Sequence, residues 1–142
     1  MSKIERRKVL KTPEEAIKEA KRYYKNAKEI LKETPIEYGI IYSDSKPVRE
    51  ACAIGYLAVL FAIDSFILKK GKNPNELPKD FSSYMEWLSK IPHNGKLKAQ
   101  FYAVYDILHL YGYYRGGIEV NAIKSGFKHA KNIIDTFAKL IS

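Results

Sequence analysis

The chain has few of the residues and motifs that usually carry covalent or metal chemistry. Its single cysteine, Cys52, cannot form an intramolecular disulfide, and it lies in the apolar run ACAIGYLAVLFAI, where we expect an inert, buried thiol. The 142 residues contain no phosphate-binding loop, no paired Cys-x-x-Cys and no nucleophile-elbow pattern. These absences argue against the enzyme classes that such motifs mark, and we expect neither a bound metal nor a cofactor.

Signals for secretion or membrane insertion are also weak. The basic N-terminus MSKIERRKVLK is followed by no apolar stretch, which argues against a signal peptide. Residues 51–68 are long and apolar enough to suggest a membrane span. Asp64 near one end, the small residues and the lack of an aromatic belt favour instead a central helix buried in protein. We therefore predict a cytoplasmic protein with no membrane contact.

Positive charge is in excess. The 25 Lys and Arg residues against 16 Asp and Glu give a net charge of +9, which favours an anionic partner such as RNA, a nucleotide or an acidic protein. The alternative is a lysine-rich surface that serves only solubility. Twenty of the 25 basic residues are lysines and Gln100 is the only glutamine, a bias that is typical of heat-adapted proteins.

The length predicts one domain over residues 13–142, preceded by a basic arm at 1–12. Apolar residues recur at helical spacing, and the predicted helices cover about 13–32, 45–70, 81–91, 95–111 and 120–141. Thr12, Asp44 or Ser45, and Asp80 are suitable caps. The second helix is apolar nearly all round, so we expect the others to surround it. We predict no strand, and an all-α fold: an antiparallel up-and-down four-helix bundle with one additional short helix.

The segment YDILHLYGYYRGG carries the most suggestive polar residues. On an ideal α-helix Tyr102, Asp106, His109 and Tyr113 share one stripe, which points away from the apolar seam. Asp-x-x-His resembles half of a carboxylate-bridged metal site, but no second such motif occurs, so we predict no metal. The alternatives are a hydrogen-bonded pair on the solvent side and a tyrosine-lined surface that meets a partner. We favour the surface because aromatic residues are enriched at interfaces.

Asp64 is unusual because its helix face is otherwise apolar. A buried carboxylate needs a partner, and Arg115, His109 or a tyrosine hydroxyl are the candidates. Asp64 is then either a structural acid satisfied by such a group or a functional carboxylate with a raised pKa.

Gly116 and Gly117, directly after Arg115, offer backbone amides that bind an anion, or form a simple turn between helices. We predict a working surface made of Tyr42, Asp44 and Ser45 together with Tyr102, Asp106, His109, Tyr113, Arg115 and Gly116. In it Arg115 and the backbone at Gly116 hold the anion, and the tyrosines supply flat contact area.

The segments EAKRYYKNAKEIL, YSDSKPVREACAIGYLAVLFAID, YDILHLYGYY and HAKNIID occur in an order that resembles a small bacterial family of unknown function related to the HEPN group of helical bundles. The resemblance spans about residues 14–135. It implies an antiparallel four-helix bundle that often dimerises and that accompanies nucleotidyltransferases in toxin–antitoxin pairs. It also implies a ribonuclease motif in which a histidine follows an arginine by four to six residues.

The sequence departs from that motif. Arg115 is followed at the sixth position by Asn121, and His109 precedes the arginine. No imidazole is then in place to assist attack by a ribose hydroxyl. We therefore predict a homodimeric binding module without turnover of its own, which binds an anionic partner or a nucleotidyltransferase-type protein. The alternative is a divergent, metal-independent ribonuclease, for which Asp64, Asp106, His109 and Arg115 would have to converge.

Overall fold

The structure, a computed structural model, describes residues 10–142, so most of the predicted basic arm, 1–12, lies outside the described residues. The chain is mostly helical, as expected of an all-α protein. In chain order the elements are α2 (Pro13–Glu33), β1 (Ile36–Glu37), β2 (Ile41–Tyr42), α3 (Ser45–Lys69), the 3₁₀ turn η1 (Pro74–Glu76), α4 (Phe81–Leu88), α5 (Gly95–Val104), the π-helix η2 (Tyr105–Tyr114) and α6 (Val120–Ile141).

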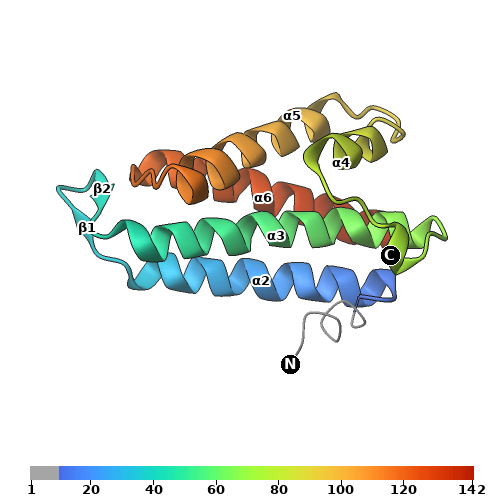
Figure 1. The fold of residues 1–142 in the computed structure, drawn as a ribbon, viewed down its shortest axis with the longest axis horizontal. Helices are drawn as coiled ribbons and strands as arrows, with labels where there is room; N and C mark the ends of the chain where they lie inside the picture. Colours follow the sequence, from blue (N-terminus) through green and yellow to red (C-terminus); the bar gives the residue numbers. More distant parts are fainter. Residues whose placement is uncertain (1–9) are drawn as a thin grey trace.

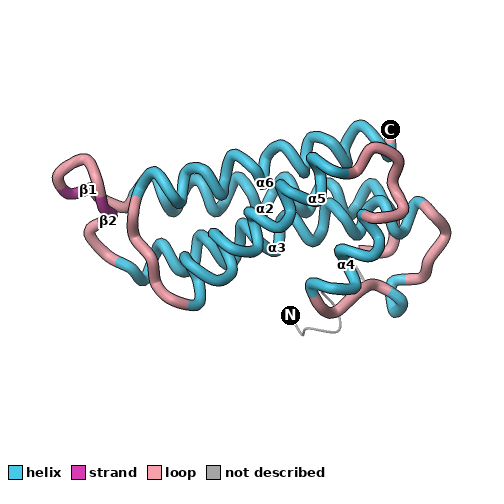
Figure 2. Tube along the Cα trace, turned by 90° about the horizontal axis from the view of Figure 1, so that it is seen from above, coloured by secondary structure: helices cyan, strands magenta, loops and turns pink. Residues whose placement is uncertain are grey.

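The long helix α3 organises the packing. It contacts α2, α6, η2 and, near its C-terminal end, α4. In Figure 1 α2 and the α5–η2 run lie on either side of α3, and α6 runs alongside both α3 and α5, as Figure 2 shows from above. The largest side chains between them, including Ile63, Phe101, Phe127 and Phe137, are fully buried. Burial of such side chains stabilises the fold by roughly 1.5–3 kcal/mol each relative to exposure.

The predicted helix starts are confirmed. The Thr12 hydroxyl accepts from the Glu15 N–H at 3.1 Å and the Asp80 carboxylate from the Ser83 N–H at 2.8 Å. Of the two candidates for α3, Asp44 is the cap and Ser45 is the first helical residue. These caps satisfy N–H groups that have no partner within the helix.

The prediction of no strand is wrong. Residues 36–42 form a small antiparallel hairpin, in which Ile36 pairs with Tyr42 and Glu37 with Ile41. Tyr38 and Gly39 both have positive φ, at 55° and 68°, and the Ile40 N–H donates to the Glu37 carbonyl at 3.0 Å. Two positive φ values in succession are the mark of a type I′ turn, and tyrosine is an unusual residue for it.

The predicted α-helix over 95–111 is only partly right. It is α-helical to Val104 and continues as a π-helix to Tyr114. The wider turn shows at its end, where the Arg115 N–H donates to the Leu110 carbonyl, five residues back, at 2.9 Å. An ideal α-helical wheel therefore misplaces the side chains beyond Val104.

The prediction that other helices surround the second helix holds for most of α3. By length and composition α3 could cross a membrane, and 67% of its most apolar 18-residue stretch is buried inside the protein. One face remains open: Leu57 is 41% exposed, and Ala53, Tyr56 and Leu60 are half-buried.

Candidate functional site

The four predicted catalytic candidates do not converge. Arg49, near the start of α3, contacts the segment that holds Arg115, since its guanidinium donates to the carbonyls of Tyr113 and Tyr114 at 3.2 and 3.4 Å. Asp64 lies fifteen residues further along α3, about 22 Å at the α-helical rise. Arg115 and Asp64 therefore cannot act on one reacting bond.

Asp64 is buried against α4. It is 5% exposed, and the Tyr84 hydroxyl donates to its Oδ1 at 2.8 Å. Burial raises the pKa of Asp64 to about 7, while the Tyr84 hydrogen bond opposes the rise. Of the partners considered from the sequence, a tyrosine hydroxyl is the one observed; Arg115 and His109 are not. Asp64 therefore has features of both interpretations: its carboxylate is satisfied by a neighbouring hydroxyl, and its pKa is raised.

Tyr84 belongs to a group of phenols that the sequence gives no reason to bring together. Burial raises the pKa of Tyr84 and of Tyr56, with a smaller contribution to Tyr84 from the nearby Tyr56 and to Tyr56 from the nearby Tyr105. These side chains come from α3, α4 and η2, so Asp64 lies at a junction of three helices. The sequence does not indicate that Tyr84 is the partner of Asp64, because Tyr84 lies twenty residues further along the chain on a separate short helix.

His109 belongs to a row of stacked rings. Its centroid lies 5.3 Å from that of Tyr105 and 6.0 Å from that of Tyr113, with interplanar angles of 27° and 21°. Tyr56 of α3 stacks on His109 at 4.8 Å. We call Tyr105, His109 and Tyr113, with Tyr56, the aromatic row. Residues four apart lie above one another here, and each such ring pair contributes roughly 0.5–1.5 kcal/mol beyond its buried area.

The predicted stripe of Tyr102, Asp106, His109 and Tyr113 is thereby divided. Asp106 is exposed, whereas His109 turns toward α3 and is half-buried. Among the hydrogen bonds of residues 10–142 none joins the two, so the hydrogen-bonded pair considered from the sequence is not formed. Tyr102 and Tyr113 are exposed, as a partner surface requires.

The turn after η2 is built by its own backbone. Gly116 has a φ of 71°, and a Cβ placed there would collide with the Arg49 guanidinium. The Gly117 N–H donates to the Tyr111 carbonyl at 2.7 Å, and the Arg115 N–H is also bonded within the chain. Of the two glycine amides considered for anion binding, that of Gly117 is therefore already occupied, which favours the simple turn. Arg49, which organises this turn, was missed by the sequence reasoning.

The Tyr42–Asp44–Ser45 part of the predicted surface is mostly structural. Tyr42 is 2% exposed, and its N–H donates to the Ile118 carbonyl at 2.9 Å. Its flat ring is thus not available to a partner. Asp44 is exposed but caps α3 through the Lys46 N–H. Ser45 is exposed at the helix start.

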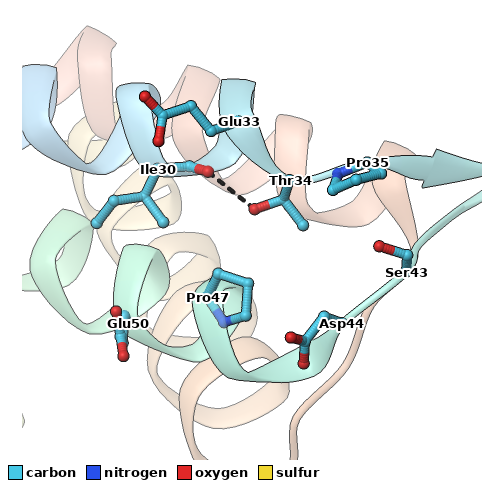
Figure 3. A pocket seen from close by; sticks show the side chains of 8 residues that line it. All are labelled: Ile30, Glu33, Thr34, Pro35, Ser43, Asp44, Pro47 and Glu50. Atoms are coloured by element: carbon cyan, nitrogen blue, oxygen red, sulfur yellow. Dashed lines mark hydrogen bonds between the residues drawn. The ribbon is translucent and has the colours of Figure 1, made fainter.

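An open pocket of about 440 Å³ lies beside this loop, between the end of α2 and the start of α3 (Figure 3). Ile30, Pro35 and Pro47 give it apolar walls, and three carboxylates line it, those of Glu33, Asp44 and Glu50. In Figure 3 the three carboxylates point in different directions. Within the part of the chain that the structure describes, no three His, Cys, Asp or Glu side chains come together as a metal site would need.

Charge is unevenly distributed along the molecule. The segments 33–50 and 106–121, which meet at the hairpin end, hold six acidic residues and only three basic ones. Residues 69–98, at the end that carries α4, hold seven lysines against three acids (Figure 1). The seven are Lys69, Lys70, Lys72, Lys79, Lys90, Lys96 and Lys98. The α4 end is therefore net positive, whereas the hairpin end, where Arg115 lies, is net negative.

Comparisons with known proteins give a family but no activity. Residues 15–139 match a domain of unknown function, DUF5618. A solved protein of unknown function from Dyadobacter fermentans is similar, with 36% sequence identity and a TM-score of 0.77. The match covers 92% of this chain and 99% of that one. No curated protein matches.

Proposed function

We propose that this chain, which belongs to the DUF5618 family, is a binding module for a polyanionic partner such as RNA. It does not turn over a substrate of its own. We further infer that its helices form a four-helix bundle of the HEPN kind. The side-by-side run of α2, α3, α5–η2 and α6 supports that inference (Figures 1 and 2).

The unequal distribution of charge carries the proposal. Seven lysines within thirty residues give the α4 end a positive field, while the hairpin end is acidic. Phosphates release counterions when they meet such a cluster, which supplies most of the free energy of non-specific RNA binding. The Lys90 Nζ lies 4.0 Å from the centroid of the Trp87 ring, so one of these lysines is held in place by a cation–π contact.

The separation of the catalytic candidates favours binding over cleavage. General acid–base catalysis needs its groups within hydrogen-bond reach of one reacting site. Asp64 lies about 22 Å along α3 from the Arg49 contact with the Arg115 turn, and His109 stacks on Tyr56 between them. A ribonuclease that uses His109 and Arg115 is the second candidate function, because both lie on or beside η2.

Binding of a labelled single-stranded RNA over a salt series tests the proposal. We expect affinity to fall steeply with salt, and reversal of Lys72 and Lys79 to glutamate to lower the slope by about 0.7 for each phosphate that is no longer neutralised. Arg115→Ala is the comparison variant, since Arg115 lies at the acidic end. A flat salt dependence in the unmodified protein contradicts the proposal. A larger effect of Arg115→Ala keeps RNA binding but moves it to the surface predicted from the sequence.

Cleavage is followed in the same samples. If the RNA is cut, and cutting is lost in both His109→Ala and Arg115→Ala, the ribonuclease is the correct function. We also propose a homodimer that works with a nucleotidyltransferase-type protein in a toxin–antitoxin system, and co-purification with the product of a neighbouring nucleotidyltransferase gene tests that role.

A further inference from the structure

The middle of α3 leaves an apolar face uncovered. Residues 51–63 contain no charged side chain, and Ala53, Leu57 and Leu60, at intervals of four and three, point to one side. Leu57 is 41% exposed and the other two are half-buried. We call Ala53, Tyr56, Leu57 and Leu60 the open α3 face.

The open α3 face has defined edges. On one side Tyr23 of α2 packs edge-on against Phe61 at 4.9 Å, and on the other His109 stacks on Tyr56. The opposite side of α3 is closed by α6, where Gly55 lies directly against Phe127. Toward the C-terminal end α4 covers α3 through the Tyr84 contact with Asp64. The result is an apolar strip of about two helical turns between aromatic edges.

Charge identifies the occupant. Each chain carries +9, so two copies that meet on a lysine-bearing surface place positive charge against positive charge. The outward faces of the other long helices carry such lysines, for example Lys25 of α2 and Lys128 of α6, both exposed. A two-fold interface brings the same patch of both copies together, and it must therefore be self-complementary. A strip without charge meets that condition.

We propose that a second copy of this chain covers the open α3 face, with α3 of one copy packed against α3 of the other across a two-fold axis. Ala53 permits close approach of the two helices, and Leu57 and Leu60 interdigitate around it. Tyr56 and the aromatic row then border the interface, and Tyr113 at 45% exposure extends it. This inference rests on the dimeric state given under the proposed function and names the surface that forms it.

Leu57→Glu is the first test, with Leu140→Glu as its matched control. Both are exposed leucines on helices, at 41% and 46%, but Leu140 lies near the end of α6, away from the open α3 face. By sedimentation over a concentration series we expect the unmodified chain and Leu140→Glu to have twice the 16.3 kDa chain mass. Leu57→Glu should sediment as a monomer, with its dimer dissociation constant raised about 30-fold or more. Far-UV circular dichroism confirms that both variants fold.

A cross-linking variant keeps the proposal testable if the glutamate disturbs folding. The native thiol, Cys52, is fully buried, so Leu57→Cys adds one accessible thiol at the strip. We expect a short bismaleimide to join two Leu57→Cys chains and to leave Leu140→Cys chains single.

Three results overturn the proposal: a monomeric unmodified chain, a dimer that survives Leu57→Glu, or equal cross-linking of the two cysteine variants. A monomer whose binding to phosphatidylglycerol vesicles is lost in Leu57→Glu assigns the strip to a membrane surface instead. Loss of RNA binding leaves the sedimented mass unchanged, so failure of the proposed function and failure of this interface are distinguishable.

Discussion

Replacing Asp64 with asparagine should change how the stability of the protein depends on pH. The substitution keeps the shape of the side chain and an oxygen that accepts from the Tyr84 hydroxyl, but it removes the titrating proton. Any difference between the two proteins that varies with pH then reports on the ionisation of Asp64.

The size of the effect follows from the position of the carboxyl. Its pKa is 3.8 for an aspartate in free contact with water and about 7 in the fold. Between these values the native state holds one proton more than the unfolded state, so the free energy of unfolding falls as the pH rises. At about 1.36 kcal/mol for each pKa unit, the loss is roughly 4 kcal/mol above pH 7 and absent below pH 4. Asp64→Asn should escape that loss.

Urea unfolding of the unmodified protein and of Asp64→Asn, near pH 4 and near pH 8, measures this difference. Circular dichroism follows the helices, and Trp87 fluorescence follows α4, which covers Asp64. Asp106→Asn serves as the control, because it makes the same chemical change at an acid that is exposed rather than buried. We expect Asp64→Asn to be more stable than the unmodified protein at high pH, and the two to be nearly equal in acid.

An equal stability difference between Asp64→Asn and the unmodified protein at both pH values would contradict this prediction. A lower stability of Asp64→Asn at high pH would contradict it as well. Either result would mean that the ionised carboxylate is well satisfied in the fold, and that burial next to Tyr84 does not govern its protonation.

Two further outcomes follow from the structure. Gly116→Ala should lower the free energy of unfolding by about 1–3 kcal/mol, because φ is positive there and Arg49 occupies the space; thermal unfolding measures this, with the unobstructed Gly95→Ala as a control that stays near neutral. Burial raises the pKa of the Cys52 thiol to about 12, so a thiol reagent near pH 8 should modify it only after urea unfolds the chain, and rapid labelling of the native protein would contradict its burial.

The helices could be predicted from the sequence because their signals are local. Thr12, Asp44 and Asp80 each precede a helix that they cap, and the apolar spacing of each helix is set by residues within one or two turns. Such patterns depend on hydrogen bonds and burial that are determined by residues close together in the sequence.

The hairpin and the π-helix could not be predicted in the same way. Tyr38 adopts a positive φ that its side chain disfavours, and it is held there by the pairing of residues 36–42 and their contact with 118–120. The widening of η2 has no sequence marker, and η2 packs against α3. Tertiary contacts overrule the local preference at Tyr38.

The candidate site was predicted only in outline. Asp64 is a buried acid with a polar partner, as the sequence predicts, but that partner, Tyr84, reaches it from a different helix. Tyr42 was expected on the surface together with Asp44 and Ser45, yet the hairpin turns its ring into the core. The polarity of charge along the molecule became visible only when distant segments were placed together.

The wide turn of η2 also makes the length of this segment a structural variable. A relative with one residue fewer between positions 105 and 114 can close the segment as an ordinary α-helix, and the tighter turn then changes the directions of the side chains within it. The rings at 109 and 113 would turn off Tyr56, and the Arg49 guanidinium would lose the carbonyls that it holds. A gap in this stretch of an alignment therefore marks the relatives in which the side chains bordering the open α3 face are arranged differently.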